Sequence, residues 1–298
     1  MNPPTTTWLR RTLLAAGAAL FLLPLVWMLT TSLKPAEQAA SGRVTLLPWP
    51  ITNGVPDFGA GIGERLTEAA RQGAANYDAV WSDPSITFPI YLRNTLIVAA
   101  LSVVGMTLSS AIVAYGLSRI RWRGRGMVLA SVLVTMMIPF PVLMAPLYIV
   151  FRELGWIGSL KPLWVPAWFG GAFNIFLLRQ FYMGLPRELD EAARIDGLGH
   201  WGTFWRVIVP LSRPALAVVA LFHFIYVWND FLAPLIFLTH REDFTLALGL
   251  QLYQSKAGLT PWNLLMAASS LVFLPVLILF LLAQRAFVQG VAAEGVKG

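Results

Sequence analysis

The residues best placed for specific chemistry form one charged segment, Glu188-Leu-Asp-Glu-Ala-Ala-Arg-Ile-Asp-Gly197, which lies between long apolar stretches. Its acidic side chains complement the dipole at a helix N-terminus, and Pro186 suits a first helical turn. Asp190 and Arg194 form a favourable i,i+4 pair, and Gly197 suits the left-handed residue after a helix end. The segment is therefore predicted to be a short helix that stays out of lipid and contacts a soluble partner.

The apolar residues of this region predict two packing faces. Leu189, Ala192 and Ala193 fall on one narrow face, where small side chains would let the helix sink into a cleft. Residues 199–209 have apolar side chains at i, i+3, i+4 and i+7, which predicts a second helix lying along the lipid headgroups. These side chains are Trp201, Phe204, Trp205 and Ile208. An ordinary solvated loop is the simpler alternative.

Composition indicates an all-α, polytopic membrane protein. The chain is 57% hydrophobic and 12% charged, against about 25% charged residues in a globular protein. Several apolar stretches exceed the roughly 20 residues that cross a bilayer, and lipid requires internally bonded backbone, which helices provide. The absence of cysteine excludes disulfides, thiolate metal sites and a cysteine nucleophile. The net charge of +7 sits largely in short loops, which favours membrane orientation over nucleic-acid binding.

We predict six transmembrane helices. They cover residues 12–33, 92–117, 127–151, 163–181, 214–238 and 264–283. The first is longer than the apolar core of a signal peptide, which is about 7–15 residues, so cleavage is not expected. Residues 1–33 are expected to form the N-terminus and the first span, and residues 34–88 an external loop with a polar helix at 64–72. Residues 89–285 are expected to form the core, which includes a cytoplasmic segment at 182–212, and residues 286–298 a tail.

Arginines define the orientation. Four of them lie within Arg119-Ile-Arg-Trp-Arg-Gly-Arg125, which is typical of a basic anchor at the cytoplasmic face. An even number of spans puts both termini on that side. Within the spans, small residues predict close helix packing and prolines predict kinks. The small residues are Ser102, Gly105, Ser109 and Ser110, and the prolines are Pro139, Pro141 and Pro146.

One motif resembles a known family. Glu191-Ala-Ala193, Gly197 and Val207-Ile-Val-Pro210 are spaced as in the EAA loop of ABC importer permeases, where the pattern ends in Ile-x-Leu-Pro. Val at both aliphatic positions is a mild departure. Three further matches point to the sugar branch, and in particular to the smaller maltose-type permease. They are Asn94-Thr-Leu, Trp228-Asn-Asp-Phe-Leu-Ala-Pro234 and the ending Phe287-Val-Gln-Gly…Gly295-Val-Lys-Gly298. Residues 50–73 look like an insertion.

The resemblance implies a subunit of an ATP-driven importer in a bacterial or archaeal cytoplasmic (inner) membrane. A separate ATPase would bind ATP and Mg, dock on the EAA helix and switch the spans between inward and outward access. Such importers pair two permeases, two ATPases and an external solute-binding protein. The matched coupling residues are Glu191, Ala192, Ala193 and Gly197, and helix geometry adds Glu188 and Asp196. With no Gly-x4-Gly-Lys-Ser/Thr loop, the chain is expected to bind no ATP, and we expect no catalytic or metal site.

The expected cargo is a sugar, such as a maltose- or trehalose-like oligosaccharide, with a polyol phosphate also open. Asn229 and Asp230 could bond sugar hydroxyls, while Tyr226 or Trp228 could stack on a sugar ring. Alternatively, these residues cap a broken helix near Pro234 or bond neighbouring helices.

The outer loop at 239–261 is expected, by resemblance, to approach the binding protein through Leu248, Gly249 and Gln251. Its residues alone indicate only an apolar segment with a turn at Gly249.

Two other classes of protein are possible. An ionisable residue inside a span is a candidate functional group, so His223 and Asp230 could serve a proton-coupled carrier that acts alone. The single histidine in a span and the lack of visible repeats disfavour that carrier, and helix packing is the simpler role for His223. An intramembrane enzyme is disfavoured because the chain lacks Gly-x-Ser-x-Gly and His223 has no evident serine partner.

Overall fold

The computed structural model describes residues 4–41, 45–52, 55–254 and 260–295. Helices dominate these ranges, as predicted. The only strands within them are β1 (Ile51–Thr52) and β2 (Val55–Pro56), which pair antiparallel. The chain divides into two compact units: residues Met1–Phe88 with Gly249–Pro275, and residues Pro89–Leu248 with Val276–Gly298.

The first unit contains α1 (Pro4–Ser32), α2 (Ala36–Ala40) and α3 (Ile62–Ser82). The polar helix predicted at 64–72 is therefore too short, because buried residues continue at helical spacing to Val80. Buried Asn76 of α3 donates to the carbonyls of Ser32 and Lys34 and accepts from Asn263. Burial lowers the pKa of the Lys34 amine. The described residues of the predicted external connection therefore belong to this unit.

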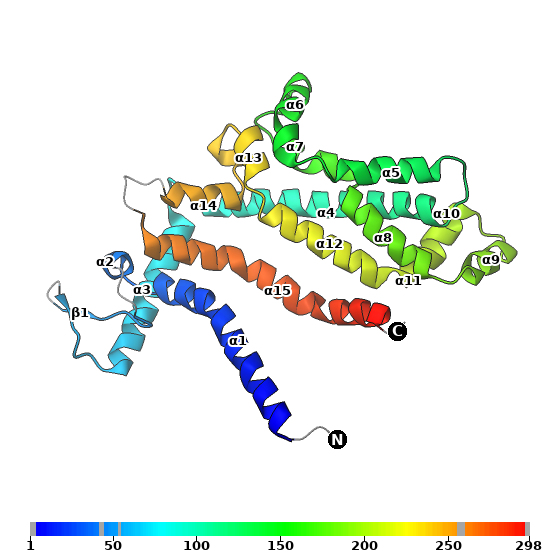
Figure 1. The fold of residues 1–298 in the computed structure, drawn as a ribbon. Coiled ribbons are helices and arrows are strands. Elements are labelled where there is room, and N and C mark those ends of the chain that lie inside the picture. The colour runs from blue at the N-terminus through cyan, green and yellow to red at the C-terminus, as the bar shows by residue number, and fades with distance from the viewer. Residues whose placement is uncertain (1–3, 42–44, 53–54, 255–259, 296–298) are drawn as a thin grey trace. The chain divides into compact units, whose positions relative to one another are not determined.

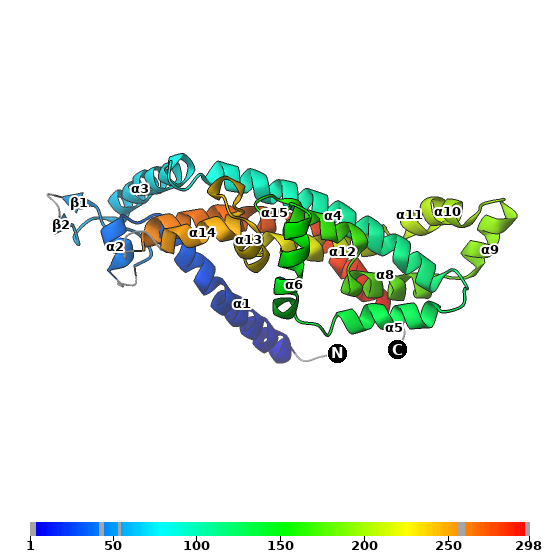
Figure 2. The same cartoon turned by 90° about the horizontal axis from the view of Figure 1, so that it is seen from above.

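The second unit holds most of the helices (Figure 1). The elements that follow α3 along the chain are α4 (Phe88–Ser118), α5 (Arg125–Thr135), α6 (Phe140–Glu153), α7 (Lys161–Trp164), η1 (Val165–Phe169), α8 (Ala172–Gly184), α9 (Glu188–Ile195), α10 (His200–Thr203), η2 (Phe204–Ile208), α11 (Val209–Leu211), α12 (Arg213–Trp228), α13 (Leu232–Phe237), η3 (Arg241–Asp243), α14 (Leu246–Gln254) and α15 (Trp262–Gly295). α8 packs against α5 and α12, while α9 to α11 lie at one end of these helices in both views (Figure 1 and Figure 2).

Three helices are long and apolar enough to cross a membrane within the described ranges: Trp8–Ser32, Phe88–Ser118 and Trp262–Leu282. Two bent pairs raise the count to as many as five. α5 and α6 meet at 99°, and the helical stretch His200–Leu211 meets α12 at 78°. The predicted spans at 127–151, 163–181 and 214–238 are each interrupted rather than continuous helices. The last helix also continues beyond the predicted end of its span, to Gly295.

Each break has a local cause. The predicted kink in the third span is a full break, because α5 ends at Thr135 and Pro139 precedes the first residue of α6. Pro146 lies inside α6. Gly170 has φ +84°, a left-handed conformation that favours glycine, and it interrupts the fourth span. The fifth span breaks between Trp228 and Leu232, where Asp230 caps the next helix.

The small residues of α4 allow the close packing that was predicted. A Cβ atom added to Gly105 would lie 2.4 Å from the Trp168 side chain. The hydroxyl of Ser102 donates to the Leu163 carbonyl, and that of Ser109 donates to the Ala167 carbonyl. α4 therefore contacts the broken 163–171 segment through backbone groups as well as side chains.

Candidate functional site

The charged segment predicted to be a short helix forms α9. α9 begins at Glu188, two residues after Pro186, so the proline precedes the first turn rather than entering it. At its other end the N–H of Leu198 donates to Ala193 O (2.9 Å), and that of Gly197 donates to Arg194 O (3.0 Å). Gly197 has φ +77°, as predicted. This pair of bonds is a Schellman motif, which closes the helix and reverses the chain.

The two faces of α9 differ from the prediction. Ala193 is buried at 3% exposure, whereas Ala192 is exposed and Leu189 is half-buried, so these residues do not form one docking face. The other predicted coupling residues are exposed; they are Glu188, Glu191, Asp196 and Gly197. Ile195 was missed, although it is 87% exposed. The available signal was an isoleucine placed between two charged residues, Arg194 and Asp196.

Asp190 is paired differently from the sequence prediction. Its carboxylate forms an ion pair with Arg119, which follows the last residue of α4, and not with Arg194. Arg119 is itself buried at 4% exposure, so it is not the exposed membrane anchor that the run of arginines predicted. A tertiary ion pair has replaced the local i,i+4 pair.

The stretch after α9 divides into a buried and an exposed half. Phe204 and Ile208 are buried, while Trp201 and Trp205 are exposed, so the predicted continuous apolar face is wrong. η2 is a π-helical turn, which changes the helical spacing on which that face depended. The Phe204 ring lies 5.2 Å from that of Tyr115 in α4. Phe204 and Ile208 join a hydrophobic core formed with α4, α8 and α12.

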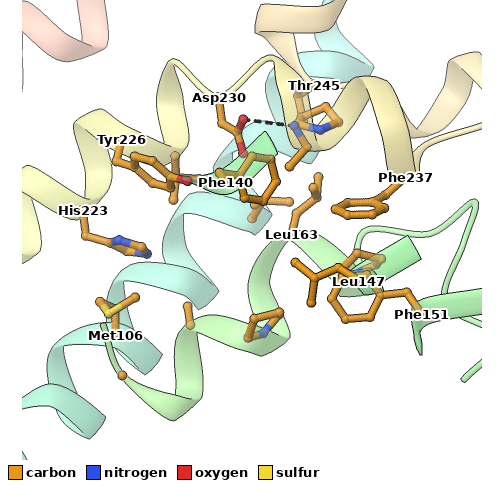
Figure 3. A pocket seen from close by; sticks show the side chains of 18 residues that line it. Met106, Phe140, Leu147, Phe151, Leu163, His223, Tyr226, Asp230, Phe237 and Thr245 are labelled. Atoms are coloured by element: carbon orange, nitrogen blue, oxygen red, sulfur yellow. Dashed lines mark hydrogen bonds between the residues drawn. The ribbon is translucent and has the colours of Figure 1, made fainter. Parts of the chain in front are cut away.

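A cavity of about 280 Å³ lies further along the second unit (Figure 3). Its walls come from α4, α6, α12, α13 and the 162–170 segment, and most of them are apolar. Its polar lining residues are His223, Tyr226, Asp230 and Thr245. Gly170 and Asp230, which lie at the breaks in the fourth and fifth spans, are among the lining residues. The breaks therefore help to shape this cavity.

Two of the four predicted substrate residues line the cavity. Tyr226 and Asp230 do so, whereas Trp228 is buried against Phe224 and does not. Asn229 is exposed, is not among the lining residues and donates to the Ile225 carbonyl.

Asp230 also caps a helix, because its Oδ1 accepts from the Ala233 N–H at 3.2 Å (Figure 3).

His223 is buried, as a packing residue would be, but it also lines the cavity. Its ring stacks on Tyr226 with the ring planes 20° apart. Within the described part of the chain, its Nε2 has no hydrogen-bond partner. A buried, unpaired ring nitrogen costs free energy unless a solute or water bonds it, so His223 is a candidate ligand group.

Only one of the three residues predicted to contact the binding protein is exposed. Gly249 lies within α14 rather than at a turn, and both Leu248 and Gly249 are buried. Gln251 is exposed. Leu246 and Tyr253 are seven residues apart, which places them on one face of a helix, and both are buried. This packing outweighed the glycine as a turn signal.

Residues 105–293 match the family described as the binding-protein-dependent transport system inner membrane component. Over 97% of this chain and 98% of the relative, the sequence is 35% identical to the trehalose/maltose transport system permease protein MalG of Thermococcus litoralis. It is 31% identical to the arabinooligosaccharides transport system permease protein AraQ of Halalkalibacterium halodurans, over 99% of this chain and 98% of that protein. It is also 31% identical to the sn-glycerol-3-phosphate transport system permease protein UgpE of Yersinia pestis, over 93% of each.

The fold is similar to a chain in the crystal structure of a bacterial ABC transporter involved in the import of the acidic polysaccharide alginate. The TM-score is 0.76 at 23% identity, covering 96% of this chain and 98% of that one. The chain therefore belongs to the family of inner membrane components of binding-protein-dependent transport systems.

Proposed function

We propose that this chain is the permease subunit of an ATP-driven importer for a neutral oligosaccharide, with α9 as its coupling helix. The observation that carries the proposal is the two-sided form of α9. One side is fixed to the chain through Ala193 and Asp190, and the other presents Glu188, Glu191 and Ile195 to solvent. An exposed isoleucine rimmed by carboxylates has the composition of an interface core with a polar rim.

The proposed partner on this surface is a cytoplasmic ATPase that binds ATP and Mg, present in two copies. Its movement on ATP binding would displace α9 and η2. Because Phe204 and Ile208 of η2 pack in the core with α4, α8 and α12, that displacement would open the cavity to one side or the other. A second, homologous permease and an external solute-binding protein complete the proposed importer. Both termini are proposed to be cytoplasmic, on the side of α9.

The cavity supports a sugar as cargo. His223, Tyr226 and Asp230 supply an unpaired ring nitrogen, an aromatic ring and a carboxylate, groups that bond hydroxyls or stack on a sugar ring. Its lining includes no lysine or arginine, which the capture of a phosphate would favour. Two of the relatives named above are permeases for trehalose/maltose and for arabinooligosaccharides, which supports an oligosaccharide. The cavity disfavours the polyol phosphate.

The direct test is purification of the tagged chain from native membranes in a mild detergent, with mass spectrometry of what accompanies it. We expect an ATPase, a second permease and a solute-binding protein, and the binding protein can then be screened against oligosaccharides. Recovery of the chain alone, with uptake surviving ATPase inhibition, would contradict the proposal. That result would instead support a proton-coupled carrier using Asp230.

A further inference from the structure

Arg119 occupies an unusual position for an arginine next to a membrane span. It directly follows the last residue of α4, yet its side chain is only 1% exposed. Burying a guanidinium costs several kcal/mol unless its donors are satisfied. The following arginines, such as Arg121 and Arg123, are exposed. The burial of Arg119 therefore calls for a specific set of partners.

Those partners lie in α8, in α9 and in the link between these two helices. The Nη1 group donates to the carbonyls of Tyr182 (2.9 Å) and Leu185 (2.8 Å), and Nη2 donates to that of Pro186 (2.8 Å). The carbonyls at the end of a helix lack partners within it, so the guanidinium caps the end of α8. The same guanidinium forms the ion pair with Asp190 of α9.

A second arginine, which precedes α9, donates hydrogen bonds to the end of α4. Arg187, just before α9, donates to the carbonyls of Ser118 (3.3 Å) and Arg119 (3.4 Å) at the end of α4. The end of α4 and the start of α9 are thus joined through side chains from both segments. A rigid connection of this kind transmits a displacement of α9, because α4 and α8 cannot stay in place without breaking it.

We propose that Arg119 is a positioning residue, which locks α9 to the ends of α4 and α8 and so transmits motion of the coupling helix to the transmembrane helices. This inference rests on the proposed function. It separates two roles within one run of arginines. Arg119 carries mechanical coupling, whereas the exposed arginines after it act through their charge at the membrane face.

The test uses the assembled transporter in proteoliposomes. The chain has no cysteine, so Tyr226→Cys introduces a single reporter on it, at a cavity residue that is 59% exposed. A membrane-impermeant maleimide labels the reporter with and without a non-hydrolysable ATP analogue. Adding the analogue is expected to change the labelling rate about fivefold or more, the lower range of measured coupling.

Adding Arg119→Gln is expected to abolish that change while the ATPase still co-purifies and hydrolyses ATP. Asp190→Asn keeps the three carbonyl bonds and removes only the ion pair, so it serves if Arg119→Gln fails to fold, and it is expected to weaken the change. Arg123→Gln, an exposed arginine of the same run, is the matched control and should leave the change intact.

Three outcomes would contradict either the positioning role of Arg119 or the proposed function on which it rests. A full ATP-dependent change in Arg119→Gln or in Asp190→Asn would overturn the positioning role. An equal loss in Arg123→Gln would also overturn it, because the effect would then follow net charge. If the Tyr226→Cys parent shows no ATP-dependent change at all, the proposed coupling of ATP binding to the cavity through α9 is wrong and this inference fails with it.

Discussion

Ala192 and Ala193 are neighbours in α9 but differ in environment: Ala193 is buried at 3% exposure, and Ala192 is exposed to solvent. The sequence motif treats the two alanines alike. In the structure, Ala193 packs against the rest of the chain, whereas Ala192 lies on the surface proposed to contact the ATPase.

Ala193→Leu is therefore expected to destabilise the chain, because added methylenes in a packed site cost about 1–3 kcal/mol. Ala192→Leu should change stability by less than about 0.5 kcal/mol, as surface substitutions do, while weakening ATPase binding by filling the docking surface. Thermal unfolding in detergent and ATPase co-purification separate the two effects. Equal destabilisation by both variants would show that α9 is oriented differently.

Gly197→Pro is expected to leave the protein in the membrane but to uncouple ATP hydrolysis from transport. The glycine has φ +77° and its N–H donates to Arg194 O, whereas proline fixes φ near −65° and has no N–H. Gly199→Ala is the control, since Gly199 has φ −75° and open space around its Cα. ATP hydrolysis and uptake are measured in the same vesicles. Coupled uptake in Gly197→Pro at the wild-type ratio would contradict the role of this cap.

Asp230 distinguishes the importer from a proton-coupled carrier. Asp230→Asn keeps an oxygen that can accept from the Ala233 N–H, so uptake is expected to stay near the wild-type level. Asp230→Ala removes the cap, which costs about 0.5–2 kcal/mol at comparable positions, and should lower both stability and uptake. Uptake is measured with and without a protonophore. Complete loss in Asp230→Asn, together with sensitivity to the protonophore, would favour the carrier.

The contact between Gly105 and Trp168 predicts an asymmetric effect of alanine along α4. Gly105→Ala would bring a methyl group within 2.4 Å of the indole, so we expect a clear fall in the thermal unfolding midpoint. Gly116→Ala in the same helix meets nothing within 4 Å and should be neutral or slightly stabilising, since alanine favours helix over glycine by about 1 kcal/mol. Similar behaviour of the two variants would argue against the close packing of α4 on Trp168.

Much of this architecture could be predicted from the sequence because hydrophobic length and capping chemistry are local. The first, second and last spans follow from apolar runs, and the left-handed Gly197 follows from the end of a charged helix. The EAA spacing placed α9 correctly.

The breaks could not be predicted from hydropathy, because Gly170 and Asn229 interrupt helices without making their surroundings polar.

The contacts that the sequence predicted wrongly have one physical cause: tertiary packing overrides the preferences that follow from local spacing. Asp190 pairs with Arg119 rather than with Arg194, and Trp228 packs on Phe224 instead of facing the cavity. Leu248 turns inward because α14 is a helix and not a loop. Their residue types and spacing are those expected of residues that contact a partner or a solute. Only the folded structure shows that they pack inside the chain instead.

The most direct test of the central claim is site-specific photo-crosslinking from Ile195, which is 87% exposed on α9. A photoreactive amino acid at Ile195 should form an adduct with the ATPase in intact membranes. The same group at Leu235, which is 49% exposed on α13, should not. An ATPase adduct from Ile195 alone is the predicted result. No ATPase adduct from Ile195, in membranes where the transporter is active, would contradict the claim that α9 is the coupling helix.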